Sequence, residues 1–217
     1  KLPKILVFHN RLSTEISLGN SEIDHDDYLS KISPLLKDVK KVFISESKRG
    51  DWGMDGDVIL PGIDVDQYGG YTGDNRSILR VGNLLRERDL MMGFSAGEDI
   101  ISDLPSVTLG VNPSIHGSRL SSGFDDLISN YRSQRVFLNT TIENYEDGYN
   151  LSLLEAMAVG MPGISTVNKT SPIENGGNGF ISNDIKYLTQ CAAKLLDDQK
   201  LAKVLGDKAR ETVRNKF

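Results

Sequence analysis

EDGYNLSLLEAMAVGMP, residues 146–162, lies between two short apolar runs, RVFLNT at 135–140 and GISTV at 163–167. Each run is short and rich in β-branched or aromatic residues, which predicts a strand. The stretch between them predicts a helix over residues 150–159, with an apolar side at Leu151, Leu154, Ala158 and Met161 and a helix stop at Gly160 and Pro162. Strand, helix, strand in this order predicts one unit of a parallel sheet.

The same alternation continues in both directions along the chain. Further strands are predicted at residues 5–9, 41–45, 77–82 and 106–111. Further helices are predicted at residues 26–39, 84–104 and 124–134, and two more over 184–216. We therefore expect an α/β fold with a Rossmann-like, mostly parallel sheet that carries helices on both faces. Such sheets bind ligands at the carboxyl ends of their strands.

A change in composition predicts a domain boundary near residues 62–76, which are rich in Gly and Asp and poor in periodic apolar residues. Residues 1–69 are expected to be the end of an incomplete N-terminal domain together with a linker. Residues 70–217 are expected to form a ligand-binding domain. The segment before the boundary has two strands and one helix by this reading, which is too little for an independent core.

The bulk composition excludes several classes of protein. The 217 residues are 38% hydrophobic, as in an ordinary globular protein, and the net charge of -5 argues against a nucleic-acid partner. No run of 18 apolar residues and no signal-peptide pattern is found, so we expect a cytoplasmic location. The three histidines lack the spacing of metal ligands, and the single cysteine, Cys191, is expected to pack in a helix.

Two carboxylates lie at the start of the helix in residues 146–162. Asp147 or Asn150 can cap the first amides, and these amides suit a phosphate group. Gly148 would let a ligand approach the backbone. Glu155 lies in the middle of an apolar helix, where an ionised carboxylate needs partners. It is either an exposed or Arg-paired side chain, or an acceptor for two neighbouring hydroxyls such as those of a ribose.

This stretch resembles the signature segment of the family-4 retaining glycosyltransferases of the GT-B fold, in which seven residues separate two acidic ones before LEAMA-GxP. Asp147 and Glu155 have this spacing. Three other segments resemble the family's basic strand and loop, its interdomain segment and its Gly- and Asn-rich run: ILRVGNLLRERD at 78–89, VILPGIDVDQY at 58–68 and TSPIENGGNGFI at 170–181. The resemblance covers about residues 57–217.

The resemblance implies a hexosyltransferase-type enzyme that moves a sugar from a nucleotide-sugar donor to an acceptor hydroxyl with retention. It implies no metal and no cofactor besides the nucleoside diphosphate sugar as co-substrate. The acceptor would be a carbohydrate or a lipid-linked molecule, with peripheral membrane contact through a missing N-terminal portion. Residues 1–69 would then belong to the acceptor side and residues 70–217 to the nucleotide-sugar side.

The resemblance also assigns roles to individual residues. The catalytic residues would be Asp147 against the transferred sugar, Arg88 against the leaving diphosphate, and His9 at the mouth of the cleft. Glu155 would accept hydrogen bonds from the ribose. The residues implied in donor binding are Gly82, Asn83, Gly148, Tyr149, Asn150, Leu151 and Glu155.

The sequence departs from the family at several of these positions. Asp147 stands where the family has Glu, which shortens the reach by one methylene, and misplacement of about 1 Å can cost on the order of a hundredfold in rate. Asn83 stands where the family usually has Arg, Asn150 replaces a glycine, and Arg88 replaces a Lys. Residues 112–123 are shorter than the family's base-contacting segment, so the nucleobase cannot be inferred.

Interpretations without a catalytic role stay open for Arg88 and His9, and a second function stays open for the chain. Arg88 could equally be a solvated charge at a helix start, and His9 a satisfied histidine at a strand end. The alternative function is a donor-binding domain without turnover of its own. A sugar-nucleotide epimerase of the same fold would need acid and base residues that we do not find.

Overall fold

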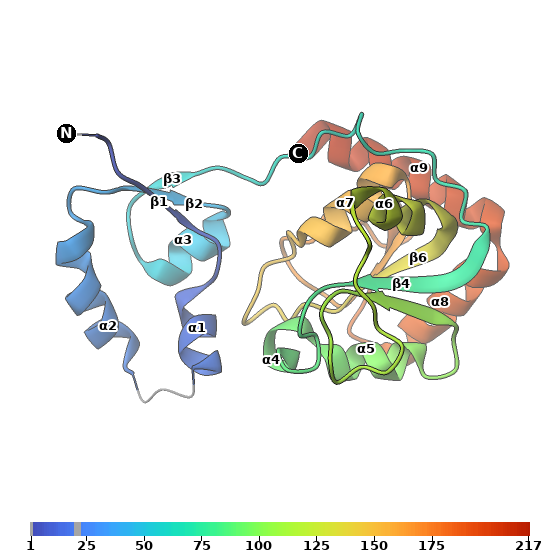
Figure 1. Cartoon of the computed structure of the whole chain (residues 1–217), viewed down its shortest axis with the longest axis horizontal. Helices are drawn as coiled ribbons and strands as arrows, with labels where there is room; N and C mark the ends of the chain where they lie inside the picture. Colours follow the sequence, from blue (N-terminus) through green and yellow to red (C-terminus); the bar gives the residue numbers. More distant parts are fainter. Residues whose placement is uncertain (1, 20–22) are drawn as a thin grey trace.

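The computed structural model describes residues 2–19 and 23–217 and contains two separate parallel sheets (Figure 1). The described residues up to Val58 form the N-terminal part, with the first sheet. Residues 75–217 form the C-terminal part, with the second sheet. Residues 59–74 connect the two parts, and the boundary predicted after residue 69 falls in this connection. The prediction of an α/β fold with parallel sheets and flanking helices is confirmed.

The N-terminal part has three strands in the order β1-β2-β3. Its strands are β1 (Ile5–Phe8), β2 (Lys40–Phe43) and β3 (Asp57–Val58). Its helices are α1 (Leu12–Leu18), α2 (His25–Ile32) and α3 (Glu46–Trp52), with a 3₁₀ turn η1 (Ser33–Leu36) after α2. The helix predicted over 26–39 therefore ends early, at Ile32, and is followed by the 3₁₀ turn that contains Pro34. Helices α1 and α3 and strand β3 were not predicted.

The C-terminal part has five strands in the order β5-β4-β6-β7-β8, and every neighbouring pair is parallel. These strands are β4 (Asn75–Val81), β5 (Ser106–Leu109), β6 (Gln134–Asn139), β7 (Gly163–Ser165) and β8 (Gly179–Ile181). Strand β8 was not predicted. Strands β5 and β6 lie on opposite sides of β4, so the order of the strands reverses between β4 and β6.

Six helices cover both faces of this sheet. They are α4 (Asp89–Met92), α5 (Phe94–Ile101), α6 (Phe124–Ser133), α7 (Leu151–Val159), α8 (Ile185–Asp197) and α9 (Gln199–Lys216). Helices α6, α7 and α9 pack on one face, while α5 and α8 pack on the other (Figure 1). The free Cys191 is buried in the second of these clusters, as predicted.

The helix predicted over residues 84–104 is interrupted. Residues 84–88 form a turn, and Gly93 separates α4 from α5 with a left-handed φ of 60°. A Cβ at Gly93 would collide with the carbonyl oxygen of Thr140. The interruption therefore lets the turn after β4 approach the chain that follows β6.

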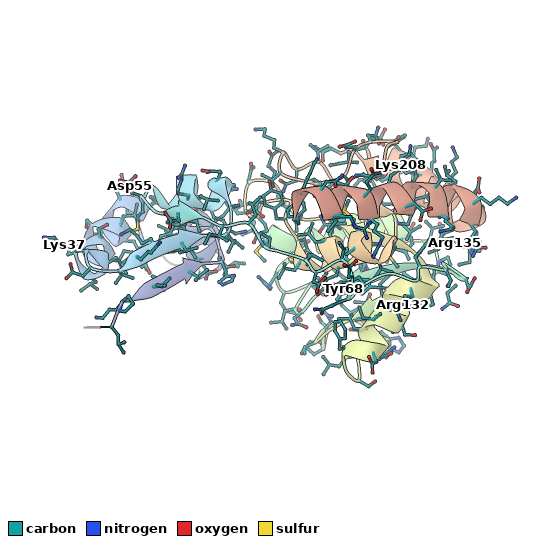
Figure 2. All side chains as sticks on the ribbon, turned by 90° about the horizontal axis from the view of Figure 1, so that it is seen from above. Lys37, Asp55, Tyr68, Arg132, Arg135 and Lys208 are labelled. Carbon is teal, nitrogen blue, oxygen red and sulfur yellow. The ribbon has the colours of Figure 1, made fainter. Side chains whose placement is uncertain are left out.

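The connection between the two parts lies against the C-terminal part. Arg210 of α9 donates to the carbonyl oxygen of Val65 (2.7 Å), and Arg132 of α6 donates to that of Gly69 (2.6 Å). Tyr68 accordingly lies beside Arg132 on the larger lobe, whereas Lys37 lies on the smaller one (Figure 2). No helix among residues 2–19 and 23–217 is long and apolar enough to cross a membrane.

Candidate functional site

The two loops that carry most of the predicted site residues meet where the strand order reverses. One loop follows β4 and the other follows β6. The amide of Ile142 donates to the carbonyl oxygen of Met91 (2.9 Å), and the hydroxyl of Thr140 donates to that of Met92 (2.8 Å). In an open α/β sheet this crevice is the usual ligand site. The fold thus brings the segment with Gly82, Asn83 and Arg88 next to the segment with Asp147.

The start of α7 is capped by Asn150, one of the two caps that the sequence allowed. Its side-chain oxygen accepts from the amide of Leu153 (3.2 Å). Leu151, predicted on the apolar side of the helix, is instead 54% exposed. The other three residues of that side, Leu154, Ala158 and Met161, are buried as predicted. Burial also extends around the helix, because α7 is enclosed by several elements and Leu153 to Val159 are buried except Glu155. Leu151 lies at the open end of α7.

Gly148 is in close contact with another segment of the chain. Its amide donates to the hydroxyl of Thr170, and a Cβ at Gly148 would collide with the backbone of Ser171. The space that we assigned to a ligand is thus filled by residues 170–171 in this structure. The next residue, Tyr149, packs its ring edge-on against Phe217 at a centroid distance of 5.4 Å.

Glu155 is half-buried and accepts hydrogen bonds from two tyrosine hydroxyls. Tyr131 of α6 donates to Oε2 (2.9 Å), and Tyr68 of the connection donates to Oε1 (3.3 Å). Burial and then the charge of Glu155 raise the pKa of Tyr68 to about 12, and the same causes raise the pKa of the buried Tyr131 well above its usual value. Both phenols therefore stay protonated near neutral pH and can donate. Glu155 is neither a freely exposed nor an Arg-paired carboxylate.

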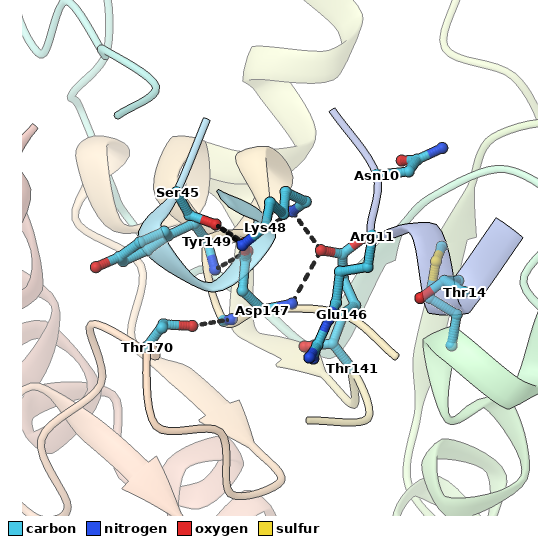
Figure 3. A network of polar contacts seen from close by, with 12 residues as sticks. Asn10, Arg11, Thr14, Ser45, Lys48, Thr141, Glu146, Asp147, Tyr149 and Thr170 are labelled. Carbon is cyan, nitrogen blue, oxygen red and sulfur yellow. Dashed lines mark hydrogen bonds and ion pairs between the residues drawn. The ribbon is translucent and has the colours of Figure 1, made fainter. Parts of the chain in front are cut away.

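Asp147 is only 2% exposed and faces the N-terminal part (Figure 3). Its Oδ2 accepts from the hydroxyl of Ser45 (2.5 Å) and from Nζ of Lys48 (2.8 Å), while Oδ1 accepts from the amide of Tyr149 (3.1 Å). Lys48 also donates to Glu146. Burial raises the pKa of Glu146, and the charge of Lys48 opposes this effect. A sugar hydroxyl that binds Asp147, as predicted, must therefore share the carboxylate with these protein donors.

A cleft of about 610 Å³ separates the two parts beside this network. The N-terminal part contributes Arg11, Ser13 and Asp51 to its walls, and the C-terminal part contributes Glu143, Asp147 and Lys169, among others. Both signs of charge and several hydroxyl and amide groups line the cleft. Such a surface can donate to and accept from a ligand rich in hydroxyl groups.

The loop after β4 presents a cation. Arg88 is half-buried at the start of α4, its Nη2 lies 3.6 Å from the sulfur of Met91, and the described residues give it no carboxylate partner. Leu84, four residues earlier, has a φ of 52° and is the one non-glycine residue with positive φ in the part of the chain that the structure describes. Such strained backbone often occurs in functional loops.

Gly82 and Asn83 have structural contacts in the same loop. The carbonyl oxygen of Gly82 accepts from the side chain of Asn112 (2.8 Å), and Oδ1 of Asn83 accepts from the amide of Val111 (2.8 Å). The amide side chain that replaces the family's arginine therefore fastens the loop after β4 to the loop after β5.

His9 follows β1 and is exposed. Across residues 2–19 and 23–217 it has neither a hydrogen bond nor an ion pair, so the structure does not join it to Asp147 or Arg88. Its neighbour Arg11 does contact the C-terminal part, donating to the carbonyl oxygen of Glu143 (2.7 Å).

The sequence did not reveal the partners of the two motif carboxylates. Ser45 ends a predicted strand and is a good helix cap, and it does accept from the amide of Lys48 (3.1 Å). That signal could have predicted α3, but not the contact of Lys48 with Asp147. No sequence pattern indicated that Tyr68 and Tyr131 contact Glu155. The described residues contain no group of three or more His, Cys, Asp or Glu side chains that could hold a metal ion.

Comparisons with known proteins agree with this geometry. Residues 79–198 match the sequence profile of the glycosyl transferases group 1. The chain is 32% identical over 133 aligned positions to CapM of Staphylococcus aureus, a capsular polysaccharide biosynthesis glycosyltransferase; the match covers 59% of this chain and 33% of CapM.

Solved structures resemble the whole chain. HepE from Anabaena in complex with UDP has a TM-score of 0.73 and 13% identity, covering 99% of this chain and 68% of HepE. TarM from S. aureus has a TM-score of 0.71 and 17% identity, covering 99% of this chain and 47% of TarM. This chain therefore spans about a third of CapM and about half of TarM. The prediction of a GT-B fold is confirmed, and, since the profile matches more than half of its residues, the chain belongs to the glycosyl transferases group 1 family.

Proposed function

We propose that this chain is the donor-binding portion of a glycosyltransferase that uses a nucleotide sugar and transfers its sugar, a hexose, with retention. The observation that carries the proposal is Glu155, a carboxylate oriented by two phenols on the helix that starts at the switch point of the sheet. The solved structures of HepE with UDP and with UDP-glucose support the donor class. CapM, named for capsular polysaccharide biosynthesis, supports a carbohydrate product.

In this proposal Glu155 accepts from the ribose hydroxyls of the nucleotide. The ribose would compete with Tyr68, whose hydrogen bond at 3.3 Å is the longer of the two, while Tyr131 keeps the carboxylate in place. The diphosphate would lie between Arg88 and the amides of Asn150 and Leu151 at the start of α7. The amides of Gly148 and Tyr149 already have acceptors within the chain, so a diphosphate would have to displace these to reach them. A fixed guanidinium and a helix start both stabilise the charge that develops on a leaving phosphate, and neither needs a metal ion.

Asp147 would lie against the transferred sugar at the wall of the cleft. Among the described residues its Oδ1 accepts one hydrogen bond, from Tyr149, which leaves a lone pair for a sugar hydroxyl. Gly82 and Asn83 would shape the donor site from the loop after β4. His9 would act from the N-terminal part at the mouth of the cleft.

The acceptor would offer a hydroxyl group from a carbohydrate or a lipid-linked sugar. As the bond between the anomeric carbon and the phosphate oxygen breaks, the acceptor oxygen bonds to that carbon and its proton passes to the leaving diphosphate. The cleft of about 610 Å³, with its mixed polar walls, is where this acceptor would enter. A cytoplasmic location would supply the nucleotide sugar.

The test is the affinity of the chain for UDP, GDP and ADP, measured by calorimetry in wild type and in Glu155→Ala. One of these nucleotides is expected to bind. Glu155→Ala is expected to weaken that binding by about 1 to 3 kcal/mol, the usual loss when a charged hydrogen-bond partner is removed. Glu211→Ala is the matched control, because Glu211 is exposed on α9 and should leave affinity unchanged.

The outcomes separate the candidate functions. Equal affinity in wild type and Glu155→Ala would contradict the donor site. Nucleotide binding without transfer or hydrolysis of any common nucleotide sugar would support the alternative, a donor-binding domain without turnover of its own.

A further inference from the structure

The segment before α7 is fastened to the N-terminal part at several successive positions (Figure 3). Arg11 donates to the carbonyl oxygen of Glu143 (2.7 Å), and the hydroxyl of Thr14 donates to that of Tyr145. Lys48 then donates to the carboxylates of both Glu146 and Asp147. Arg11, α1 and α3 thus all contact residues 143–147. This segment ends at Asp147, the first acidic residue of the motif.

Lys48 is the charged centre of this contact. Its side chain is only 2% exposed, as is appropriate to a core residue, and both of its carboxylate partners belong to the C-terminal part. Removing a lysine from water costs several kcal/mol, which only well-placed opposite charges offset. Two adjacent carboxylates with low exposure would likewise repel each other without a cation between them. The cation and the acidic pair therefore depend on each other.

The contact also fixes the direction of the Asp147 carboxylate. Ser45 and Lys48 take Oδ2, which leaves Oδ1 directed at the amide of Tyr149. Tyr149 precedes Asn150, the residue that caps α7. The orientation set by Lys48 is thus passed to the backbone that starts the helix carrying Glu155.

We propose that Lys48 is a positioning residue of the site, which keeps the Asp147 carboxylate oriented only while the N-terminal part is docked on residues 143–147. The proposal rests on the proposed function for its effect on transfer, but not for its effect on Asp147 itself. The N-terminal part then contributes to the donor side of the reaction as well as to the acceptor side.

The experiment replaces Lys48 with methionine in the full chain and follows the amide resonance of Tyr149 by ¹H–¹⁵N NMR. In wild type, the hydrogen bond to Asp147 Oδ1 should shift this amide proton downfield. Lys48→Met is expected to move it upfield, because the Asp147 carboxylate loses the donor that holds Oδ2 and no longer directs Oδ1 at this amide. Lys48→Arg, which keeps a charged donor at this position, is expected to keep the amide at the wild-type position.

Turnover gives the second readout. With a nucleotide sugar that the wild type turns over, Lys48→Met is expected to lower kcat by about a hundredfold, the cost of misplacing a reacting group by about 1 Å. The donor KM should change by less than about threefold, because Lys48 does not touch Glu155 or Arg88. Lys40→Met is the matched control: Lys40 pairs with Asp57 within the N-terminal part at 2.8 Å and is 61% exposed.

Failure of this proposal differs from failure of the proposed function. A folded Lys48→Met with an unmoved Tyr149 amide would overturn the positioning role, whatever the chain binds. A wild type that binds no nucleotide would refute the proposed function, while the Tyr149 amide still decides the role of Lys48. If Lys48→Met does not fold, Lys48→Arg decides: a folded arginine variant with a displaced Tyr149 amide would overturn the proposal.

Discussion

At the scale of single residues, the two acidic side chains of the motif are stabilised by different chemistry. Glu155 is satisfied by neutral donors, the hydroxyls of Tyr68 and Tyr131. Asp147 is satisfied by a cation and a hydroxyl from the N-terminal part. Phenols can be displaced by other hydroxyl groups at little cost, whereas a buried ion pair cannot. Glu155 is thus the more available ligand for a nucleotide.

The two phenols should contribute unequally to stability. Tyr131→Phe removes a fully buried hydroxyl that donates to Glu155 at 2.9 Å. This variant is expected to lower the free energy of unfolding by about 1.5 to 3 kcal/mol, as for hydrogen bonds to charged groups. Tyr68→Phe removes a longer bond from a partly exposed hydroxyl, and about 0.5 to 1 kcal/mol is expected. Urea unfolding followed by circular dichroism measures both. Equal losses would contradict the larger contribution of the buried phenol.

At the scale of elements, helices with local start and stop signals were predicted well. The expected helix at residues 150–159 differs by one residue from α7, because Asn150 and Gly160 form its caps in the structure. Helices α1 and α3 have seven residues each and were not predicted. Isolated helices of that length are unstable, so tertiary contacts with residues 143–147 and the small N-terminal core must support them. The break at Gly93 likewise depends on a tertiary contact, because Gly93 lies against the carbonyl oxygen of Thr140.

Helix α6 is joined to the preceding loop by an ion pair whose effect should depend on pH. Nη1 and Nη2 of Arg119 bond to the two carboxylate oxygens of Asp126 (2.6 and 3.1 Å). Mainly this pair, with the amide of Ser122, lowers the pKa of Asp126 from 3.8 to about 2. A lowered pKa in the folded state stabilises the fold above the unfolded pKa, and this contribution is lost as pH falls through the folded value.

Asp126→Asn should therefore lower the urea midpoint near neutral pH, and the difference from wild type should close as the pH falls towards about 2. Urea unfolding across this pH range measures the difference. Asp125→Asn is the control, because Asp125 is exposed in the same first turn of α6 and has no ion pair among the described residues. A difference that stays constant with pH would mean that the carboxylate of Asp126 is not held by Arg119.

At the scale of the whole molecule, the sequence predicted the parallel α/β architecture but not how the two parts meet. The spacing of Asp147 and Glu155 and the alternation of strands and helices followed from local patterns. The contacts of Lys48 with Asp147 and of Tyr68 with Glu155 join residues 99 and 87 positions apart. No local pattern encodes such pairs. The first forms only when the N-terminal part docks on the loop after β6, and the second only when the connection at residues 59–74 packs against the C-terminal part.

The N-terminal part has a core of four buried apolar side chains, against two larger clusters in the C-terminal part. Phe8, Leu12, Phe43 and Trp52 make up this core. So small a core supplies little stability by itself. The N-terminal part should therefore depend on its contacts with residues 143–147 for part of its stability, and it should unfold more easily when those contacts are weakened.

Trp52 makes this dependence measurable, because it is the one tryptophan of the sequence and is 9% exposed in the small core. Its fluorescence reports the N-terminal part, whereas circular dichroism reports all helices. In wild type, the fluorescence midpoint in urea should lie at or below the dichroism midpoint, and Lys48→Met should widen the gap because it weakens the contact between the parts. Lys40→Met should not widen it. Coincident midpoints in Lys48→Met would mean that the two parts unfold as one cooperative unit without the Lys48 ion pair.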